Sequence, residues 1–145
     1  MPLQVPAKFM SVPYDGNRHP QSAEFDFGKG ANCQLWAYAV LKHFGVHVPP
    51  LRSSQLWEDK EPTEVARELR PLDLLLFNGK NDSWGAHVAI YLGDDAIAHL
   101  SKKNGLPAIC TMEEMFADPK YTVLVGAKRI KTPNKAPEAT RCPRA

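Results

Sequence analysis

One stretch of the chain, residues 32–45, predicts a single amphipathic helix that begins with a cysteine. Asn32 is a residue type that favours the N-cap position, and Gly45 is a type that favours the end of a helix. The apolar residues between them recur at the spacing of one helix face: Leu35, Trp36, Ala39, Val40 and Phe44. Cys33 is therefore predicted to be the first residue of this helix.

The thiol of Cys33 lies where a nucleophile can be activated. At the start of a helix, the unpaired backbone N–H groups and the positive end of the macrodipole favour the thiolate over the thiol. A cysteine there can also be a small apolar filler of the core, and the position alone leaves both interpretations open. A nucleophile also needs a base, which another part of the chain has to provide.

The residues after this helix predict mostly strands. The predicted order is a short helix at 54–57, a helical turn at 64–69, a strand at 73–79, a hairpin at 87–102 with its turn at 93–95, a helical turn at 112–116 and a last strand at 122–130. Helices that precede an antiparallel sheet predict an α+β fold.

Length and composition fit one globular domain. The chain has 145 residues, of which 43% are hydrophobic and 23% are charged, which is enough for a single core. Residues 1–24 are rich in proline and predict an extended arm, and residues 25–130 hold the predicted helices and strands. The last residues, 131–145, contain no Val, Ile, Leu or aromatic residue, so we expect a disordered tail there.

Charge and leader sequence limit the partners of the chain. The net charge of +2 is small and the basic residues are scattered, so no nucleic-acid partner is expected. No basic start followed by an apolar run is visible, and no run is long enough to span a bilayer. We therefore expect the chain to be cytoplasmic as synthesised, without stable membrane association, and leave open its export by a non-classical route.

The three cysteines are not expected to form a disulfide framework or a zinc site. Cys33, Cys110 and Cys142 are far apart and odd in number, which argues against both disulfide bonds and a zinc site. Cys110 lies between apolar residues and is expected inside the protein, where it is a poor nucleophile. Cys142 falls in the predicted tail and is interpreted as incidental. No metal and no other cofactor is expected.

Two histidines of the predicted hairpin are the candidate bases. His87 opens its first strand and His99 lies near the end of its second, so the two side chains are predicted to be cross-strand neighbours. A single histidine on a strand is more often packed or exposed than catalytic. A thiol, an imidazole that accepts its proton and a third polar group that orients the imidazole are, however, the parts of nucleophilic acyl transfer.

The other three histidines are assigned structural or solvent roles. His19 lies in the proline-rich arm. His43 and His47 flank the far end of the predicted helix, where a cation favours the dipole. That end lies about 16 Å from Cys33, at 1.5 Å per residue, which is too far for proton transfer.

These residues resemble the NlpC-type cell-wall peptidases, a family of papain-like cysteine enzymes. The similar blocks are, in order, "NCQLWAYAVLKHFGVHVPPLRSSQLWED", "RPLDLLLFN", "AHVAIYLGDDAIAHL" and "GAKRI". The resemblance implies a papain-like core, with the nucleophile helix packed on an antiparallel sheet. It also implies Cys33 as nucleophile, His87 as general base and acid, and His99 as the orienting third member. The implied activity is hydrolysis of an amide bond in peptidoglycan stem peptides or related peptides.

Some residues depart from the family pattern. The family usually has an Asp before the nucleophile, which, with an upstream Tyr, holds the free amine of a trimmed peptide. Asn32 lacks that charge, which is worth about 1 to 4 kcal/mol toward an ammonium group at 4 Å. Phe25 and Phe27 stand where the tyrosine is expected, and Tyr14 is the only N-terminal tyrosine. Leu72 replaces a glycine of the family, at a turn.

The predicted cleft has further candidate residues. Asn32 and Gln34 flank the nucleophile, and the polar loop "NDSWGA" leads directly into the candidate base, so we expect Asp82, Ser83 and Trp84 to line the cleft with them. The backbone N–H of Cys33 is the predicted oxyanion donor. For Trp84, capping of the core is the alternative interpretation.

Two other functions remain open from the sequence. Acyltransferases and phospholipases of the lecithin retinol acyltransferase type carry a strand similar to "HVAIYLGDDAIAH", but their Asn-Cys helix follows the histidines instead of preceding them. A catalytically silent binding module with the same fold is the second alternative. The predicted partners are a peptide or peptidoglycan, together with secretion machinery or an inhibitor protein.

Overall fold

The computed structural model describes residues 1–22 and 27–131 of the chain. Most of the predicted C-terminal tail, including Cys142, lies outside the described residues, as does Phe25. The division into an arm, a domain and a tail therefore stays a prediction. None of the helices in the two described ranges is long and apolar enough to cross a membrane.

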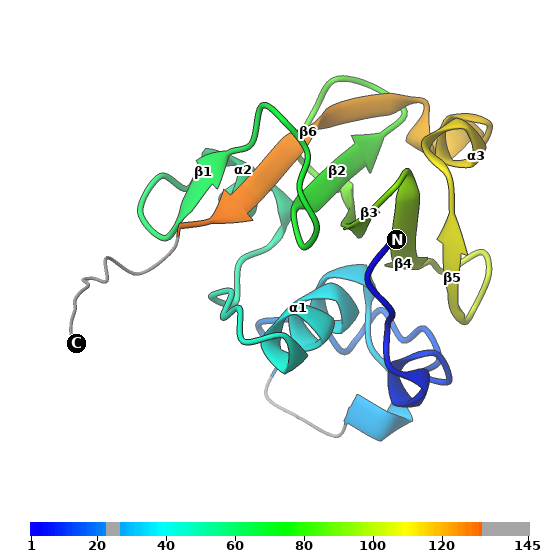
Figure 1. Ribbon diagram of the computed structural model, residues 1–145. Coiled ribbons are helices and arrows are strands. Elements are labelled where there is room, and N and C mark those ends of the chain that lie inside the picture. Colours follow the sequence, from blue (N-terminus) through cyan, green and yellow to red (C-terminus); the bar gives the residue numbers. More distant parts are fainter. Residues whose placement is uncertain (23–26, 132–145) are drawn as a thin grey trace.

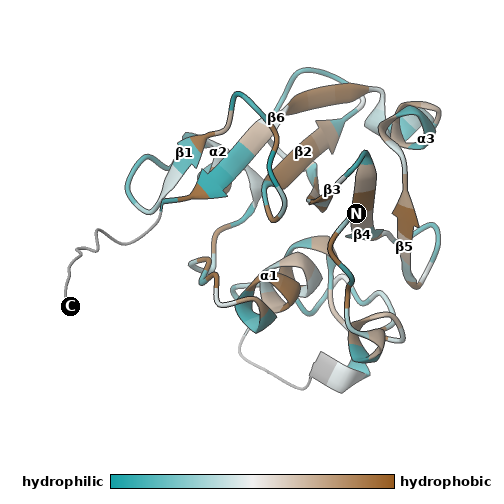
Figure 2. Ribbon diagram, in the orientation of Figure 1, coloured by the Kyte–Doolittle hydropathy of each residue, from teal (hydrophilic) through white to brown (hydrophobic). Residues whose placement is uncertain are grey.

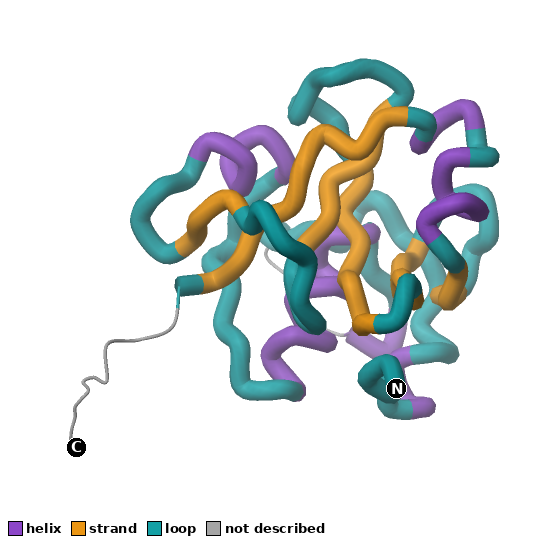
Figure 3. The backbone as a smooth tube through the Cα atoms, turned by 45° about the horizontal axis from the view of Figure 1, so that its top comes forward, coloured by secondary structure: helices purple, strands orange, loops and turns teal. Residues whose placement is uncertain are grey.

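The described residues form one six-stranded antiparallel sheet with helices around it (Figures 1 and 3). The strands are β1 (Thr63–Val65), β2 (Leu74–Asn78), β3 (His87–Gly93), β4 (Ala96–Leu100), β5 (Pro107–Cys110) and β6 (Val123–Ile130), in the order β1-β6-β2-β3-β4-β5. The helices are α1 (Cys33–His43), α2 (Ser53–Glu58) and α3 (Met112–Phe116), with 3₁₀ turns η1 (Ala7–Phe9), η2 (Phe27–Lys29) and η3 (Pro119–Tyr121). The predicted α+β fold is confirmed.

The two ends of α1 are fixed by the residues that predicted them. The side-chain oxygen of Asn32 accepts a hydrogen bond from the backbone N–H of Leu35 at 2.8 Å, so Asn32 is the N-cap. At the other end Gly45 has a φ of 84°, and the N–H of Val46 donates to the carbonyl of Leu41 at 2.9 Å. This is a Schellman motif, which requires a residue in the left-handed region. Cys33 is the first helical residue, as predicted.

The sheet is apolar on both faces. One face packs against α1 and against Phe9 and Val12 of the N-terminal segment, and α1 contacts β3 and β4 (Figure 1). The opposite face packs against α3 and carries a second cluster. As a result β2 is hydrophobic along its length (Figure 2) and buried at its first four residues. Burial on both faces explains why this strand reads as an unbroken apolar run.

The predicted hairpin is confirmed as β3 and β4. Its turn residues Asp94 and Asp95 both have positive φ, 50° and 61°, which is the requirement of a type I′ turn. Ile90 pairs with Ala98, so residues with odd numbers on the two strands share one face. His87 and His99 both lie on that face, as diagonal neighbours.

The predicted helical turn at 64–69 is wrong. Thr63–Val65 instead forms β1, in which Thr63 pairs with Ile130 of β6. The Thr63 hydroxyl also donates to the Asp59 carboxylate at 2.6 Å. Pairing with a strand that is distant in the sequence thus outweighs a local charge pattern that suits a helix. The short edge strand β5, which begins with a proline, was not predicted either.

Two contacts hold α2 against the sheet. The indole of Trp57 lies over Gly126 of β6, where a β-carbon would come within 2.4 Å of the ring. The Lys128 ammonium, buried under the same helix, donates to the carbonyl of Trp57 at 3.2 Å. A glycine at this point of β6 is therefore required for α2 to approach, and α2 forms one wall of the cleft described below.

Leu72 occupies the turn before β2. Its φ of 79° lies in the left-handed region, and the N–H of Asp73 closes the turn on the carbonyl of Arg70 at 3.0 Å. A type II turn with proline at its second position favours glycine at its third, where this chain has leucine. The departure at Leu72 thus falls on a turn away from the cleft, as predicted.

Candidate active site

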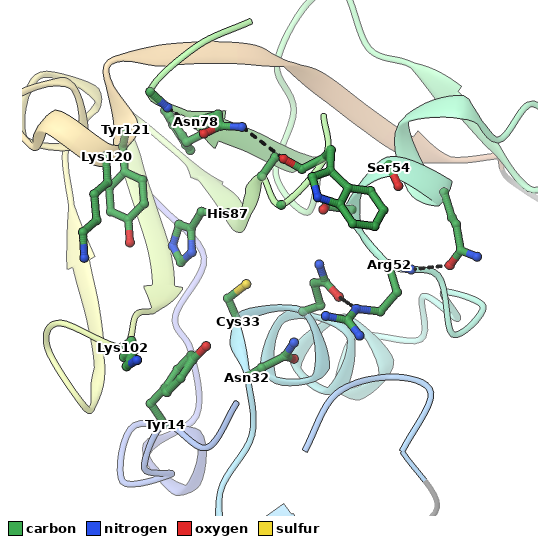
Figure 4. A pocket seen from close by; sticks show the side chains of 18 of the residues that line it. Tyr14, Asn32, Cys33, Arg52, Ser54, Asn78, His87, Lys102, Lys120 and Tyr121 are labelled. Carbon is green, nitrogen blue, oxygen red and sulfur yellow. Dashed lines mark hydrogen bonds between the residues drawn. The ribbon is translucent and has the colours of Figure 1, made fainter. Parts of the chain in front are cut away.

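A cleft of about 900 Å³ opens at the start of α1 (Figure 4). Of the residues predicted from the sequence, it is lined by Asn32, Cys33, Gln34, Trp84 and His87. Its walls come from α1 and α2 on one side and from β3, η3 and the segment after β4 on the other. Residues that are far apart in the sequence therefore meet at the thiol.

The two hairpin histidines form a hydrogen-bonded pair. Nε2 of His87 lies 2.9 Å from Nδ1 of His99, and both side chains are buried, with 8% and 5% exposure. Nδ1 of His87 has no hydrogen-bond partner among the described residues. Figure 4 shows the His87 ring and the Cys33 sulfur pointing toward one another across the cleft. The predicted proximity of the two imidazoles is confirmed, with His99 behind His87.

Tyr121 of η3 holds the His87 ring from the side. The two rings stack with centroids 4.5 Å apart and an angle of 22° between their planes. The same phenol ring meets His99 edge to face at 6.2 Å and Phe77 at 6.5 Å. Burial raises the pKa of Tyr121 to about 12, so the phenol stays protonated. Sequence reasoning missed this residue, because nothing in "DPKY" marks it as part of the site.

Burial keeps the two imidazoles neutral. Burial, with a smaller contribution from the neighbouring His99, lowers the pKa of His87 to about 3. It also lowers the pKa of His99, although the carboxylate of Asp118 opposes that change. Desolvation disfavours the charged form of any group, and here it is the main cause. At neutral pH the pair is therefore uncharged.

The surroundings of Cys33 act on its thiol in opposite directions. Burial raises the pKa of Cys33, and this is the largest effect. The backbone N–H groups of Val88 and Gln34, and then the Arg52 guanidinium, lower it. The resting cleft accordingly holds a thiol beside a neutral imidazole, with groups already in place that stabilise a negative sulfur.

The residues on either side of the nucleophile already have partners. Asn32 uses its side-chain oxygen as the cap of α1 and is 5% exposed. The side-chain oxygen of Gln34, which is 4% exposed, accepts a hydrogen bond from Nε of Arg52 at 3.1 Å. Arg52 immediately precedes α2, and the sequence analysis assigned it no role. Gln34 thus positions a guanidinium at the cleft.

The loop before β3 presents Trp84 at the mouth of the cleft. Nδ2 of Asn78 donates to the carbonyls of Asp82 and Trp84, at 2.7 and 3.3 Å. The Trp84 side chain is 76% exposed, so the alternative that it caps the core is wrong. Ser83 and Asp82 belong to this loop but do not line the cavity, so the prediction that they line the cleft is wrong. A substrate-binding role for Ser83 stays a prediction.

Tyr14 also lines the cleft. It forms a parallel bridge with Ala31, which brings the N-terminal segment alongside the residues just before α1. Tyr14 is the only N-terminal tyrosine, but its position in the cleft was not predicted, because it lies 19 residues before Cys33 in the sequence.

The remaining histidines lie away from the thiol. His43 meets the rings of Phe9 and Phe44 edge to face, at 5.7 and 5.0 Å. His47 is exposed, and Nδ1 of His19 accepts the backbone N–H of Gln21 at 3.2 Å. None of the three lines the cavity. Within the described ranges, no cluster of three or more His, Cys, Asp or Glu side chains could hold a metal ion.

Several solved structures have the same fold. A protein of the NlpC/P60 family from Bacillus cereus has 21% identity and a TM-score of 0.59, over 88% of this chain and 41% of that chain. The peptidoglycan hydrolase RipB from Mycobacterium tuberculosis has 19% identity and a TM-score of 0.53, over 85% of this chain and 60% of that chain. This chain therefore spans less than two thirds of either protein.

A third structure matches over most of its length. The NlpC/p60 domain of the peptidoglycan hydrolase SagA has 17% identity and a TM-score of 0.53, over 86% of this chain and 91% of that chain. No curated protein matches the chain. The profile of the NlpC/P60 family matches residues 16–125. With a papain-like core and a family match over most of its length, the chain belongs to the NlpC/P60 family.

Proposed function

We propose that this protein is a cysteine peptidase or amidase that hydrolyses an amide bond in peptidoglycan stem peptides or related peptides. The observation that carries the proposal is the arrangement in the cleft: Cys33 opens α1, His87 faces it, and His99 is hydrogen-bonded behind His87 at 2.9 Å. Membership of the NlpC/P60 family supports the substrate class, since two similar structures are named as peptidoglycan hydrolases.

In the first step Cys33 is the nucleophile. Nδ1 of His87 accepts the proton of the thiol as the sulfur attacks the carbonyl carbon of the amide, and a carbon–sulfur bond forms. The imidazolium then donates this proton to the leaving nitrogen as the carbon–nitrogen bond breaks. The products of this step are a free amine and a thioester on Cys33.

Water completes the reaction. His87 accepts a proton from water as the water oxygen attacks the thioester carbonyl, and the carbon–sulfur bond breaks to release a carboxylic acid. The proton returns to the sulfur, so the enzyme regains its thiol and its neutral imidazole. His99 orients the His87 ring through both steps and stabilises the imidazolium, the role of a third triad member.

The oxyanion of each tetrahedral intermediate needs donors in place before the reaction. The backbone N–H of Cys33, at the open end of α1, is the donor that we propose. Asn32, Gln34, Ser83 and Trp84 are the proposed substrate-binding residues, and the exposed indole of Trp84 offers an apolar face at the mouth of the cleft. The partners that we propose besides the peptide or peptidoglycan substrate are secretion machinery or an inhibitor protein.

The test compares the wild type with two cysteine variants. Wild type, Cys33→Ala and Cys110→Ala are incubated with intact peptidoglycan and with soluble stem peptides, and the products are identified by mass spectrometry. We expect cleavage by the wild type and by Cys110→Ala, and a loss of roughly a thousandfold or more in Cys33→Ala. The masses of the products locate the scissile bond.

Two outcomes contradict the proposal. If folded wild-type protein releases no product from any of these substrates, the binding-module alternative is favoured. If it instead transfers or releases an acyl chain from phosphatidylcholine, the acyltransferase alternative is favoured. Circular dichroism of all three proteins establishes that a negative result does not come from unfolding.

A further inference from the structure

The loop at residues 79–86 joins β2 to β3 and carries Trp84 at the mouth of the cleft. Trp84 is 76% exposed, so packing against the core does not hold its indole in place. An exposed aromatic side chain binds a ligand well only if its backbone is already ordered, because ordering a loop on binding costs conformational entropy. The usefulness of Trp84 for binding therefore depends on what fixes this loop.

Asn78, which lies at the end of β2 beside the cleft (Figure 4), closes the loop with its side-chain amide. Its Nδ2 donates to the backbone carbonyl of Asp82 at 2.7 Å and to that of Trp84 at 3.3 Å. Its Oδ1 accepts the backbone N–H of Gly79 at 2.8 Å. Both hydrogens of the amide nitrogen are thus used, together with the amide oxygen. These three bonds tie the start of the loop to its far side.

The amide of Asn78 acts where the two strands separate. Phe77 and His87 form the pair of β2 and β3 that lies nearest the loop. Beyond this pair, side-chain bonds order the backbone instead of the ladder. Besides the bonds of Asn78, the Asp82 carboxylate accepts the backbone N–H of Trp84 at 2.9 Å. Of these bonds, only those of Asn78 connect the loop to the sheet.

The catalytic base at the end of the same loop has supports of its own. His87 is held by the pairing of β3 with β2, by the hydrogen bond to His99 at 2.9 Å and by the stacked ring of Tyr121 at 4.5 Å. None of these contacts involves the amide of Asn78. Loss of that amide should therefore loosen Trp84 and leave His87 in position.

From these contacts we propose that Asn78 is a positioning residue, which fixes Trp84 for substrate binding and takes no part in the chemistry. The inference rests on the proposed function, since it takes Trp84 as a contact of the substrate. Without the amide of Asn78, the substrate has to order the loop as it binds, so binding weakens while the chemical step keeps its rate. Such a change raises KM and leaves kcat unchanged.

The loop itself offers a matched pair of substitutions. Asn78→Asp keeps the size of the side chain and an acceptor for Gly79, but it removes both donors and turns a carboxylate toward two carbonyls. Asn81→Asp adds the same charge to the same loop, at a residue that is exposed and does not line the cleft. Asn78→Ala removes the amide without adding charge. The three variants thus separate the bonds of the amide from the effect of a charge.

The first test measures the order of the loop without turnover. Backbone hydrogen exchange is followed by mass spectrometry in the wild type and the three variants. We expect peptides that cover residues 79–86 to exchange about tenfold faster in Asn78→Asp and Asn78→Ala, and at the wild-type rate in Asn81→Asp. Peptides from α1 and β4 should exchange alike in all four proteins, which establishes that the fold is kept. Unchanged exchange of the loop in both Asn78 variants overturns the inference.

The second test measures KM and kcat with the soluble stem peptide cleaved in the peptidoglycan experiment. We expect KM to rise about fivefold in Asn78→Asp and Asn78→Ala, with kcat within about twofold of the wild type. Trp84→Ala should raise KM about tenfold, and adding Asn78→Ala to it should raise KM no further, because Asn78 acts through the indole. Asn81→Asp should keep the wild-type KM. A fall in kcat at unchanged KM, additive effects in the double variant, or an equal rise of KM in Asn81→Asp contradicts the inference.

Binding without turnover separates this inference from the proposed function. Calorimetry measures the dissociation constants of the soluble stem peptides for Cys33→Ala and for Cys33→Ala/Asn78→Ala. Weaker binding by about fivefold in the double variant, without hydrolysis by the wild type, supports the inference and contradicts the peptidase proposal. Hydrolysis by the wild type with equal dissociation constants leaves the peptidase proposal standing and removes the inference. The absence of both binding and hydrolysis contradicts both.

Discussion

Two cysteines of this protein, Cys33 and Cys110, lie in opposite electrostatic surroundings. Cys33 opens α1, which packs against β3 and β4, and Cys110 ends the edge strand β5. Both thiols are partly exposed, and burial is the main reason that the pKa of each is raised. Next to Cys33, N–H donors and a guanidinium oppose that rise. Next to Cys110, the carboxylates of Glu114 and Asp95 add to it and bring the pKa to about 11.

Exposure therefore does not distinguish a reactive thiol from an inert one in this protein. What differs is the sign of the charge around the sulfur and the presence of a proton acceptor. His87 faces Cys33, whereas the neighbours that act on the Cys110 thiol are anions. Reactivity is thus a property of the residues that the fold brings to the sulfur.

The largest effect is expected when the proton acceptor that faces Cys33 is removed. We expect His87→Ala to lower the rate of peptide hydrolysis roughly a thousandfold, within the range for loss of a general base. His47→Ala, at an exposed histidine beyond the end of α1, should keep the wild-type rate. Steady-state kinetics of the two variants measure this difference. Equal rates in His87→Ala and the wild type would exclude His87 as the base.

The pH dependence of alkylation tests the difference between the two thiols. Burial raises the pKa of Cys33 and lowers that of His87 to about 3, so at neutral pH the proton lies on the sulfur. The thiolate fraction therefore increases with pH, and we expect the iodoacetamide rate at Cys33 to rise from about pH 6 to about pH 9 without a plateau in acid. We expect Cys33 to react faster than Cys110 at a given pH, because N–H donors and the Arg52 guanidinium oppose the effect of burial at Cys33, whereas two carboxylates add to it at Cys110.

A different profile would contradict this account. A rate that is already constant in acid means that a thiolate–imidazolium pair exists at rest. In that case the Arg52 guanidinium and the N–H groups at the start of α1 outweigh the burial of Cys33. Faster alkylation of Cys110 than of Cys33 would remove the basis of the comparison altogether.

The parts of the site that follow from local sequence were predictable. Asn32, Cys33 and Gly45 mark a helix by capping rules that act within a few residues. His87 and His99 belong to one hairpin, whose short turn fixes which residues become neighbours. Both depend on contacts between residues close along the chain, and the structure confirms both placements.

The parts that depend on distant contacts were missed. Tyr121 reaches His87 because η3 folds back against β2, and Tyr14 reaches the cleft through a bridge to Ala31. Thr63 belongs to a strand only because β6, much later in the chain, lies beside it. A local sequence pattern does not indicate such pairings. From the sequence alone, Tyr121 and Tyr14 were therefore not distinguished from other residues of a loop and of the N-terminal arm.

A smaller effect is expected at Tyr121, which contacts the rings of His87 and His99. Tyr121→Phe keeps the ring stacked on His87 and should retain the wild-type kcat within about threefold. Tyr121→Leu removes the stacking and should lower kcat about tenfold with little change in KM, because a mobile imidazole is less often in position. If the two variants lose the same activity, the hydroxyl and not the stacking is what matters.

The smallest expected effect lies at the inert thiol. Glu114 accepts the backbone N–H of Thr111 at 2.8 Å in the capping box of α3, and glutamine can accept the same bond, so Glu114→Gln removes the charge and keeps the cap. Losing this carboxylate lowers the pKa of Cys110, and we expect its alkylation at pH 8 to increase about twofold to threefold.

Asp95→Asn is the second variant of this test. Asp95 has a φ of 61°, which asparagine tolerates, so the hairpin turn is kept while the other carboxylate near Cys110 is removed. Its effect on Cys110 should be similar or smaller, because Glu114 is the larger of the two influences on that pKa. Cys33, measured in the same digests, should react at its wild-type rate in both variants. A different result would contradict this account. If the alkylation rate of Cys33 changes while that of Cys110 does not, the carboxylates near β5 act on the cleft, and the surroundings of the two thiols are not independent.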